Sequence, residues 1–267
     1  MEESLMNKFG ILGWPLERSY SPIIHNFLFE HVAIEGSYEL IKMNEIDNKN
    51  IDQLNKNYSG YNITIPYKEK ILETCKEADL DIHVKKIGSV NTVKNKDGIT
   101  SFYNTDYSGF LKFLEIIKFN PESKKVMLLG SGGSSKSINY ALNLMNADTT
   151  IVSRKNIVEA ISYEDLNLRA KEVDVLINTT PIGMPPYENE TLDIDIEKYN
   201  NLELVLNIGY GANNNFLELF DENIPKYDGL GMLICQAIQS FNIWTSSDLI
   251  VTSIYDEVFK QLEVQHD

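Results

Sequence analysis

The sequence predicts two α/β domains with a cleft between them. A chain of 267 residues is longer than one ordinary domain core requires. Short apolar runs alternate with helix-length stretches, which is the pattern of parallel sheets joined by crossover helices. One such run opens into a glycine-rich turn at 130–133, where a second α/β unit begins. We expect a first domain over 1–105, completed by closing helices over 232–267, and a second domain over 106–231.

The composition is that of a globular protein with an acidic surface. Apolar residues make up 43% and charged residues 24% of the chain. The formal net charge of -15 disfavours nucleic acids and anionic membranes as partners. The two cysteines, Cys75 and Cys235, lack metal-ligand spacing, so neither a disulfide framework nor a metal site is expected. Neither a signal peptide nor an apolar run long enough to span a membrane is seen, so we expect a cytoplasmic location. We also expect a monomer or homodimer that binds a small molecule.

The first domain is predicted to open as a βαβαβ unit, because three apolar runs are separated by two helix-like stretches. A pair of strand-like runs then flanks the turn signal Asp97-Gly98 and predicts a hairpin or a closely linked pair of strands. In chain order these elements are Phe9 to Leu12, Pro22 to His31, Ser37 to Met43, Asp47 to Asn57, Tyr61 to Ile65, Gly88 to Lys94 and Gly98 to Asn104.

The second domain is predicted to follow a helix that runs from Asp106 to about Lys118 and stops before Pro121. Its four strands are buried apolar runs separated by helix-length segments, as in a parallel sheet. These strands are Val126 to Leu129, Thr149 to Val152, Val173 to Asn178 and Leu202 to Ile208. Two closing helices, Met232 to Trp244 and Asp248 to Val264, are expected to pack back on the first domain.

The glycine-rich turn predicts a Rossmann-type dinucleotide site. A strand runs directly into Gly130, Ser131, Gly132, Gly133, Ser134 and Ser135, and a helix follows from about Lys136. Gly130 makes the tight turn, and Gly132 lets backbone amides approach a pyrophosphate. Ser135 takes the place of the third small residue. The alternative is a glycine-rich turn that binds nothing.

The residues after the second strand of this domain favour NADP over NAD. An NAD site usually has an acidic residue there for the ribose hydroxyl. This chain has Ser153, Arg154 and Lys155 instead. Arg154 can pair with a 2′-phosphate and Lys155 adds positive charge in an acidic chain. The alternative is that both cations belong to a solvated turn.

Polar residues gather where strands of the first domain meet helices. Lys68 follows the strand that ends near Pro66, and taken alone it is an ordinary surface lysine. Ser19 and Ser21 stand at a second connection, and Asn91 and Asp106 at further strand ends. Such connections collect at the carboxyl edge of a parallel sheet, where ligands bind. Hydroxyls, amides, one ammonium and one carboxylate together suit a polyhydroxylated ring.

Seven motifs, in order and over nearly the whole chain, resemble those of the shikimate dehydrogenase family. They are Gly13-Trp14-Pro15 with Arg18-Ser19-Tyr20-Ser21-Pro22, Asn62-Ile63-Thr64-Ile65-Pro66-Tyr67-Lys68, Ser89-Val90-Asn91-Thr92, Asn104-Thr105-Asp106, Gly130-Ser131-Gly132-Gly133, Asn178-Thr179-Thr180-Pro181-Ile182-Gly183-Met184 and Asp228-Gly229-Leu230-Gly231-Met232-Leu233. The resemblance implies an NADPH-dependent oxidoreductase that reversibly reduces 3-dehydroshikimate to shikimate, on the route to chorismate and the aromatic amino acids.

The resemblance also implies roles for individual residues. Lys68 and Asp106 are implied as the catalytic pair, and Ser19 and Ser21 as the ligands of the substrate carboxylate. The residues implied to hold the rest of the substrate are Thr64, Asn91, Asp106, Gln236 and Tyr210. Those implied to contact the cofactor beyond the glycine-rich turn are Thr180, Met184, Gly229 and Met232. Met184 and Met232 are equally consistent with core packing.

Two departures from the family pattern and three rival functions stand beside this interpretation. Asn207 occupies a place where relatives often have Asp, and 156–165 lacks the long basic helix common among them. The rivals are a quinate/shikimate dehydrogenase with relaxed cofactor use, a non-catalytic NADP-binding sensor, and an acidic interaction module. The module explains only the net charge and none of the motifs.

Overall fold

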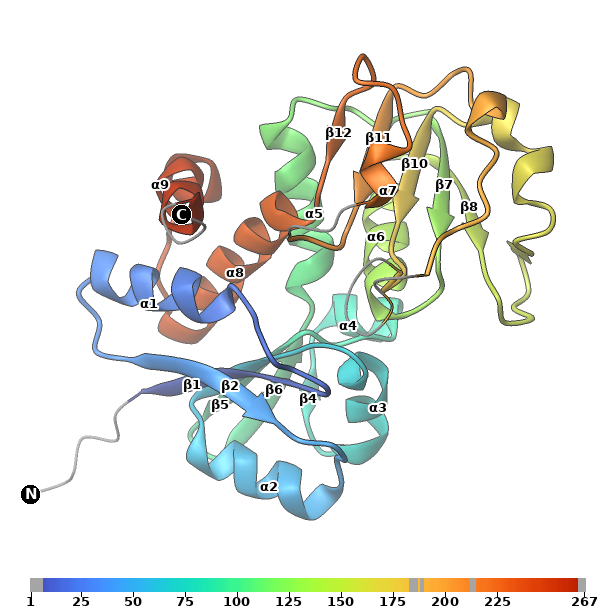
Figure 1. The fold of residues 1–267 in the computed structure, drawn as a ribbon. Coiled ribbons are helices and arrows are strands. Elements are labelled where there is room, and N and C mark those ends of the chain that lie inside the picture. The colour runs from blue at the N-terminus through green and yellow to red at the C-terminus, as the bar shows by residue number, and fades with distance from the viewer. Residues whose placement is uncertain (1–6, 183–186, 188–189, 212–214, 264–267) are drawn as a thin grey trace, which may run out of the picture. The chain divides into compact units, whose positions relative to one another are not determined.

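The computed structural model describes residues 7–182, 187, 190–211 and 215–263. The chain divides into two compact units, shown in Figure 1: Met1–Lys112 with Leu233–Asp267, and Phe113–Met232. The divisions fall slightly later than the predicted points at Asp106 and Met232. Each lies within a continuous helix, α5 (Thr105–Ile116) or α8 (Leu230–Thr245), rather than at its first residues.

The first unit is built on a six-stranded mixed sheet in the order β2-β1-β3-β5-β6-β4. Its strands are β1 (Lys8–Gly13), β2 (Ser37–Lys42), β3 (Gly60–Ile63), β4 (Asp79–Leu80), β5 (Thr92–Lys96) and β6 (Ile99–Tyr103). Strand β5 runs antiparallel to both of its neighbours, so the predicted hairpin is confirmed. The other strands share one direction, and β1, β3 and β6 therefore end at one edge of the sheet.

Helices cover both faces of this sheet (Figure 1). On one face lie α2 (Asn48–Asn57), which begins with a capping box between Asp47 and Asn50, and α3 (Tyr67–Thr74). Their apolar residues join the sheet in one buried core. On the other face lie α1 (Ser21–His31), α8 and α9 (Val251–Glu263). Helix α4 (Ile82–Ile87), which the sequence did not predict, precedes β5.

The second unit carries a six-stranded parallel sheet in the order β12-β11-β10-β7-β8-β9. Its strands are β7 (Lys125–Leu129), β8 (Asp148–Val152), β9 (Ala160–Ile161), β10 (Val175–Asn178), β11 (Leu204–Asn207) and β12 (Lys226–Tyr227). The chain starts in the middle of the sheet at β7 and adds β8 and β9 on one side. It then adds β10, β11 and β12 on the other side. This strand order is the one of dinucleotide-binding Rossmann folds, and ligands bind where it reverses. The prediction of two α/β domains, the second of the Rossmann type, is confirmed.

The two faces of the parallel sheet are covered differently. Helix α6 (Gly133–Leu144) buries Ile138, Ala141 and Leu142 against one face. The opposite face is covered mainly by short turns of helix, and its core joins their apolar residues to Met127, Leu129 and Leu176. These turns are η1 (Leu166–Leu168), η2 (Ala170–Glu172), η3 (Ile196–Lys198) and α7 (Asn215–Glu218). Among the described residues no helix is both long and apolar enough to cross a membrane.

Candidate active site

Three strand ends and one strand start meet at the same edge of the first sheet. The register pairs Leu12 of β1 with Ile63 of β3, so these two strands end together. Thr92, the first residue of the antiparallel β5, pairs with Asn62 of β3 and with Tyr103 at the end of β6. The residues that follow β3 and β6 and those that precede β5 are therefore brought to one place.

An ion pair lies at this edge. The Lys68 Nζ atom, in the first turn of α3, lies 2.7 Å from the Asp106 Oδ2 atom, in the first turn of α5. Both side chains are largely withdrawn from solvent, with 14% and 7% of their surface exposed. A carboxylate in the first turn of a helix is favoured by the helix dipole, whereas an ammonium there is not. Asp106 therefore compensates the placement of Lys68, and the structure brings together the two residues predicted as a pair.

Two buried amides adjoin Asp106. The Asn91 Nδ2 atom donates to Asp106 Oδ1 at 2.8 Å and to Gln236 Oε1 at 3.2 Å. Gln236, in α8, uses its own amide nitrogen to donate to the Leu233 carbonyl at 2.9 Å. Asn91, Asp106 and Gln236, predicted from distant parts of the chain, thus form one hydrogen-bonded cluster with Lys68.

A pair of serines stands at the start of α1. The Ser19 hydroxyl lies 3.1 Å from the Ser21 hydroxyl and accepts a hydrogen bond from the Ser21 amide at 3.1 Å. Helix α1 has no acidic residue in its first turn, so its positive end is uncompensated by the helix itself. Two hydroxyls at a helix N-terminus suit a carboxylate. Thr64, also predicted, is half-buried directly after β3, and its amide donates to the Leu12 carbonyl at 2.8 Å.

A layer of buried polar side chains behind Asn91 was not predicted as part of the site. It contains Asn62, Thr92 and Ser240, all at most 4% exposed. Asn62 and Thr92 stood inside recognised motifs but carried no assigned role. Ser240 lies one helical turn after Gln236, on the same face of α8, and this spacing was the available signal.

In the second unit the glycine-rich turn has the geometry that a pyrophosphate needs. Gly130 has a φ of +110°, and its carbonyl accepts from the Ser135 hydroxyl at 2.7 Å, which accounts for Ser at the third small position. A Cβ atom on Gly132 would meet no atom within 4 Å, so this backbone faces open space. Helix α6 begins at Gly133, and no side-chain hydrogen bond caps it among the described residues. The turn therefore fits a dinucleotide phosphate.

The residues predicted to bind the 2′-phosphate lie beside this turn. The Ser131 and Ser153 hydroxyl oxygens are 2.9 Å apart, which ties the turn to the end of β8. The Lys155 amide donates to the Ser153 hydroxyl at 3.0 Å. The side chains of Arg154 and Lys155 are exposed. Two cations next to the turn fit a phosphorylated ribose.

Thr180 and Gly229, two further residues predicted to contact the cofactor, lie elsewhere in the second unit. The Thr180 hydroxyl donates to the Asn178 amide oxygen at 2.7 Å, and the Asn178 amide nitrogen donates to Asn207 at 2.9 Å. Asn207 thus keeps a hydrogen-bonding role without a buried charge. Gly229 lies so close to the Ile208 carbonyl that a Cβ atom would be 1.9 Å from it.

Three further predicted residues are Met232, Tyr210 and Met184. Met232 is buried near the start of α8, with 4% of its surface exposed. Tyr210 is half-buried in the second unit, so its predicted contact with substrate stays a prediction. Met184 lies outside the described residues.

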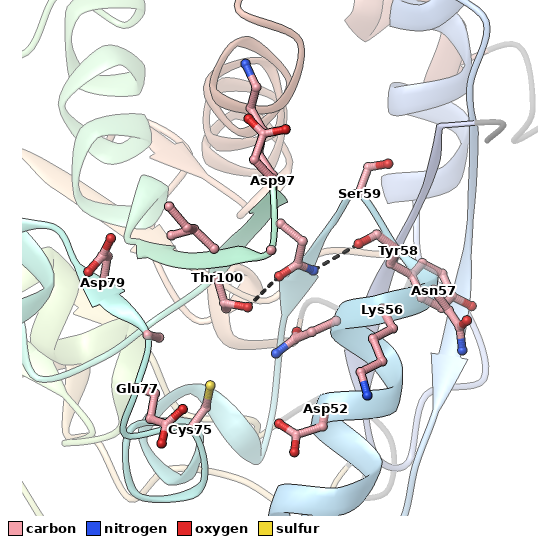
Figure 2. A pocket seen from close by; sticks show the side chains of 16 residues that line it. Asp52, Lys56, Asn57, Tyr58, Ser59, Cys75, Glu77, Asp79, Asp97 and Thr100 are labelled. Atoms are coloured by element: carbon pink, nitrogen blue, oxygen red, sulfur yellow. Dashed lines mark hydrogen bonds between the residues drawn. The ribbon is translucent and has the colours of Figure 1, made fainter. Parts of the chain in front are cut away.

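A pocket of about 780 Å³ occupies the opposite edge of the first sheet (Figure 2). It is lined by the β5–β6 turn at Asp97 and by Tyr58 before β3, and Cys75 lines it too. Among the described residues that line it, the carboxylates of Asp52, Glu77, Asp79 and Asp97 outnumber the lysines Lys56 and Lys96, so its walls are acidic on balance. None of the predicted site residues lines it, and its charge disfavours a carboxylate substrate. Within the described residues, no group of three or more His, Cys, Asp or Glu side chains could hold a metal ion.

Comparison with known proteins gives one consistent result. Residues 11–93 match the family model described as the shikimate dehydrogenase substrate binding domain. A shikimate dehydrogenase (NADP(+)) from Methanococcus vannielii is 37% identical over 264 residues, which cover 88% of this chain and 90% of that protein. Another from Clostridium perfringens is 33% identical and covers 97% and 99%. The crystal structure of shikimate dehydrogenase 1 from Peptoclostridium difficile superposes with a TM-score of 0.87 at 29% identity, covering 97% of this chain and 99% of that one.

Proposed function

This chain belongs to the shikimate dehydrogenase family, and we propose that Lys68 and Asp106 carry its reversible, NADPH-dependent reduction of 3-dehydroshikimate to shikimate. The observation that supports this assignment is the 2.7 Å ion pair at the edge of the first sheet, surrounded by amides and hydroxyls. The first unit is the substrate domain in this proposal and the second unit is the NADP domain.

Substrate is held by groups that match its chemistry. Its carboxylate binds the hydroxyls of Ser19 and Ser21 at the positive end of α1. Its ring hydroxyls bind a set of amides, hydroxyls and one carboxylate, namely Thr64, Asn91, Asp106, Gln236 and Tyr210. The buried amides suit neutral hydroxyls, because a buried polar group that loses its partner is costly.

The chemistry uses one ammonium and one carboxylate. Bound NADPH supplies the hydride that adds to the ketone carbon. Negative charge then develops on the ketone oxygen, and the Lys68 ammonium stabilises it and transfers a proton to it. Asp106 holds Lys68 in place and accepts a hydrogen bond from the substrate. In the reverse direction the neutral Lys68 amine removes the hydroxyl proton.

The cofactor is held by the second unit. The backbone of Gly130, Ser131, Gly132, Gly133 and Ser134, at the start of α6, would hold the pyrophosphate. Ser153, Arg154 and Lys155 bind the 2′-phosphate. The residues assigned near the nicotinamide are Thr180, Met184, Gly229 and Met232. A cytoplasmic location and a monomeric or homodimeric state stay predictions that rest on sequence alone.

The test is the appearance of the reduced nicotinamide absorbance when purified protein is mixed with shikimate and NADP. Parallel reactions replace shikimate with quinate and NADP with NAD. Turnover of shikimate with NADP alone supports the proposal. Equal turnover of quinate or NAD assigns the chain to the broader quinate/shikimate type, and no turnover with any pair contradicts catalysis and leaves cofactor binding to be measured.

A further inference from the structure

We infer that Thr92, supported by Asn62 and Ser240, is a positioning residue that fixes the Asn91 amide in the orientation that serves Asp106. The inference rests on the proposed function, because Asp106 matters here as the partner of Lys68. It starts from the buried layer behind Asn91, in which β3, β5, α5 and α8 contribute polar side chains to one hydrogen-bonded group.

The orientation of the Asn91 amide is determined by donors on its oxygen side. Asn91 Oδ1 accepts from the Thr105 backbone N–H at 2.6 Å and from the Thr92 hydroxyl at 3.0 Å. A reversed amide would place its NH₂ group against a backbone donor and lose both bonds. The NH₂ group therefore faces Asp106 Oδ1, and Asp106 keeps its other oxygen for Lys68.

The Thr92 hydroxyl has one proton, and Asn91 Oδ1 is a neighbour that can only accept it. The Asn62 Nδ2 atom, which can only donate, lies 3.1 Å from the Thr92 oxygen and 2.9 Å from the Ser240 oxygen. The two Asn62 protons are shared among these two hydroxyls and the Asn91 carbonyl oxygen. The Ser240 hydroxyl donates to the Gln236 carbonyl at 3.0 Å, and the Thr92 hydroxyl donates to Asn91 Oδ1, which can only accept. The Thr92 oxygen also lies 2.8 Å from the Ser240 hydroxyl and 3.1 Å from the Thr105 hydroxyl.

The side-chain amide of Asn62 also has one favoured orientation. Its Nδ2 atom lies 3.1 Å from the Asn91 carbonyl oxygen, which can only accept. Its Oδ1 atom accepts from the Tyr38 hydroxyl at 2.7 Å. Reversing Asn62 would set two acceptors against each other in a buried place, where an unpaired polar group costs most. Asn62 is therefore held with its oxygen toward Tyr38 and its NH₂ group toward Thr92 and Ser240.

These residues act through Asn91 rather than on substrate. Thr92 and Ser240 have no exposed surface, and Asn62 is 4% exposed. Loss of the Thr92 hydroxyl would leave the Asn91 amide oxygen with the Thr105 backbone N–H as its main donor, so the amide and the Asp106 carboxylate that it contacts would be held less firmly. The expected consequence is a lower kcat with little change in NADP binding, because the affected groups lie in the first unit.

The test compares Thr92→Val, which keeps the shape and the strand propensity but removes the hydroxyl, with Thr92→Ser, which keeps the hydroxyl. The matched control is Ser89→Ala, since the Ser89 hydroxyl is fully buried and has no hydrogen-bond partner within the described part of the chain. We expect Thr92→Val to lower kcat about 10-fold, Thr92→Ser to restore it to within about 2-fold, and Ser89→Ala to match wild type. NADP affinity, measured by quenching of protein fluorescence, should be the same in all four proteins.

If Thr92→Val does not fold, as judged by circular dichroism, Ser240→Ala takes its place with an expected loss of about 3-fold in kcat. A kcat for the folded variant within about 2-fold of Ser89→Ala would overturn the positioning role while leaving the proposed function intact. A lowered kcat that Thr92→Ser does not restore would also overturn it, because the hydroxyl would then not be the cause. A wild-type protein without turnover would instead overturn the proposed function, and the positioning role with it.

Discussion

Lys68 is the residue on which the proposed chemistry depends most. We predict that Lys68→Ala lowers kcat by about 100-fold or more with a modest change in the KM of shikimate, because the ammonium acts mainly on charge that develops in the transition state. The control is Lys70→Ala, which removes an exposed lysine from the same helix. Steady-state kinetics with shikimate and NADP measure both variants. An unchanged kcat in Lys68→Ala would exclude the role.

His25 is expected to make the stability of the protein depend on pH. Its ring is fully buried in α1, stacked 4.2 Å from the Tyr38 ring, and within the described residues neither ring nitrogen has a hydrogen-bond partner. Burial disfavours the charged ring and outweighs the opposing effect of the nearby Asn62 side chain, so the pKa of His25 is lowered to about 3. The unfolded chain binds a proton on this residue below about pH 6.5, whereas the folded protein does not. Stability is therefore full above about pH 6.5 and is lost as the pH falls toward about 3.

We predict that the free energy of unfolding of the wild type falls by about 2 kcal/mol more than that of His25→Leu between about pH 7.5 and about pH 5. Urea denaturation at the two pH values measures the difference. His31→Gln, which changes an exposed histidine of the same helix, should behave as wild type. Equal pH dependence in wild type and His25→Leu would show that His25 takes up a proton in the folded state.

The two residues of the ion pair could be predicted from the sequence, whereas the buried residues that support their neighbour Asn91 could not. Lys68 and Asp106 could be predicted because strand ends and motif order mark them, and the structure joins them in an ion pair. Asn62 and Ser240 could not, because a polar residue in a strand or helix does not reveal its partner 178 positions away. That pairing exists only once α8 packs against β3 and β5, which is a tertiary event.

At the scale of elements, length separates what could be predicted from what could not. The long strands and amphipathic helices were predicted because each spans enough residues to show a period. Strands β4, β9 and β12 have two residues each and α4 has six, so no period can be read from them. Helix α6 begins at Gly133 rather than about Lys136, because its first turn consists of small residues that look like loop.

The turn before α6 allows two glycines to be distinguished by experiment. Gly132 has a φ of -82° and open space around a Cβ atom, so Gly132→Ala should leave the free energy of unfolding within about 1 kcal/mol of wild type. Its methyl group would stand where the backbone meets the pyrophosphate, and we predict a rise of about 10-fold in the KM of NADP. Gly130→Ala instead forces a φ of +110° and a Cβ atom 2.7 Å from the Thr179 hydroxyl.

We therefore predict that Gly130→Ala lowers the free energy of unfolding by about 2 kcal/mol. Urea denaturation of both variants measures the free energy of unfolding, and NADP saturation curves of both variants measure the KM of NADP. If Gly132→Ala saturated with NADP like wild type, the turn would not be the pyrophosphate site. If Gly130→Ala were as stable as wild type, the strained turn would not be required by the fold.

For the molecule as a whole, charge and domain division together determine how an anionic cofactor binds. A chain with a net charge of -15 repels NADP at a distance, so binding requires cations at a defined place. Arg154 supplies one in the second unit, while Lys68 and its cluster belong to the first. Because Arg154 and Lys68 lie in separate units, substitutions at the two residues should change kcat/KM independently of each other.

We predict that Arg154→Ala raises the KM of NADP by about 10-fold or more and leaves the KM of shikimate and any turnover with NAD unchanged, because only NADP carries the 2′-phosphate. Arg169→Ala is the matched control, since it removes another exposed arginine of the second unit and changes the net charge equally. Combining Arg154→Ala with Lys68→Ala should multiply the two losses in kcat/KM. Equal losses with NAD and NADP, or a similar loss in Arg169→Ala, would mean that overall charge rather than a phosphate contact governs cofactor choice.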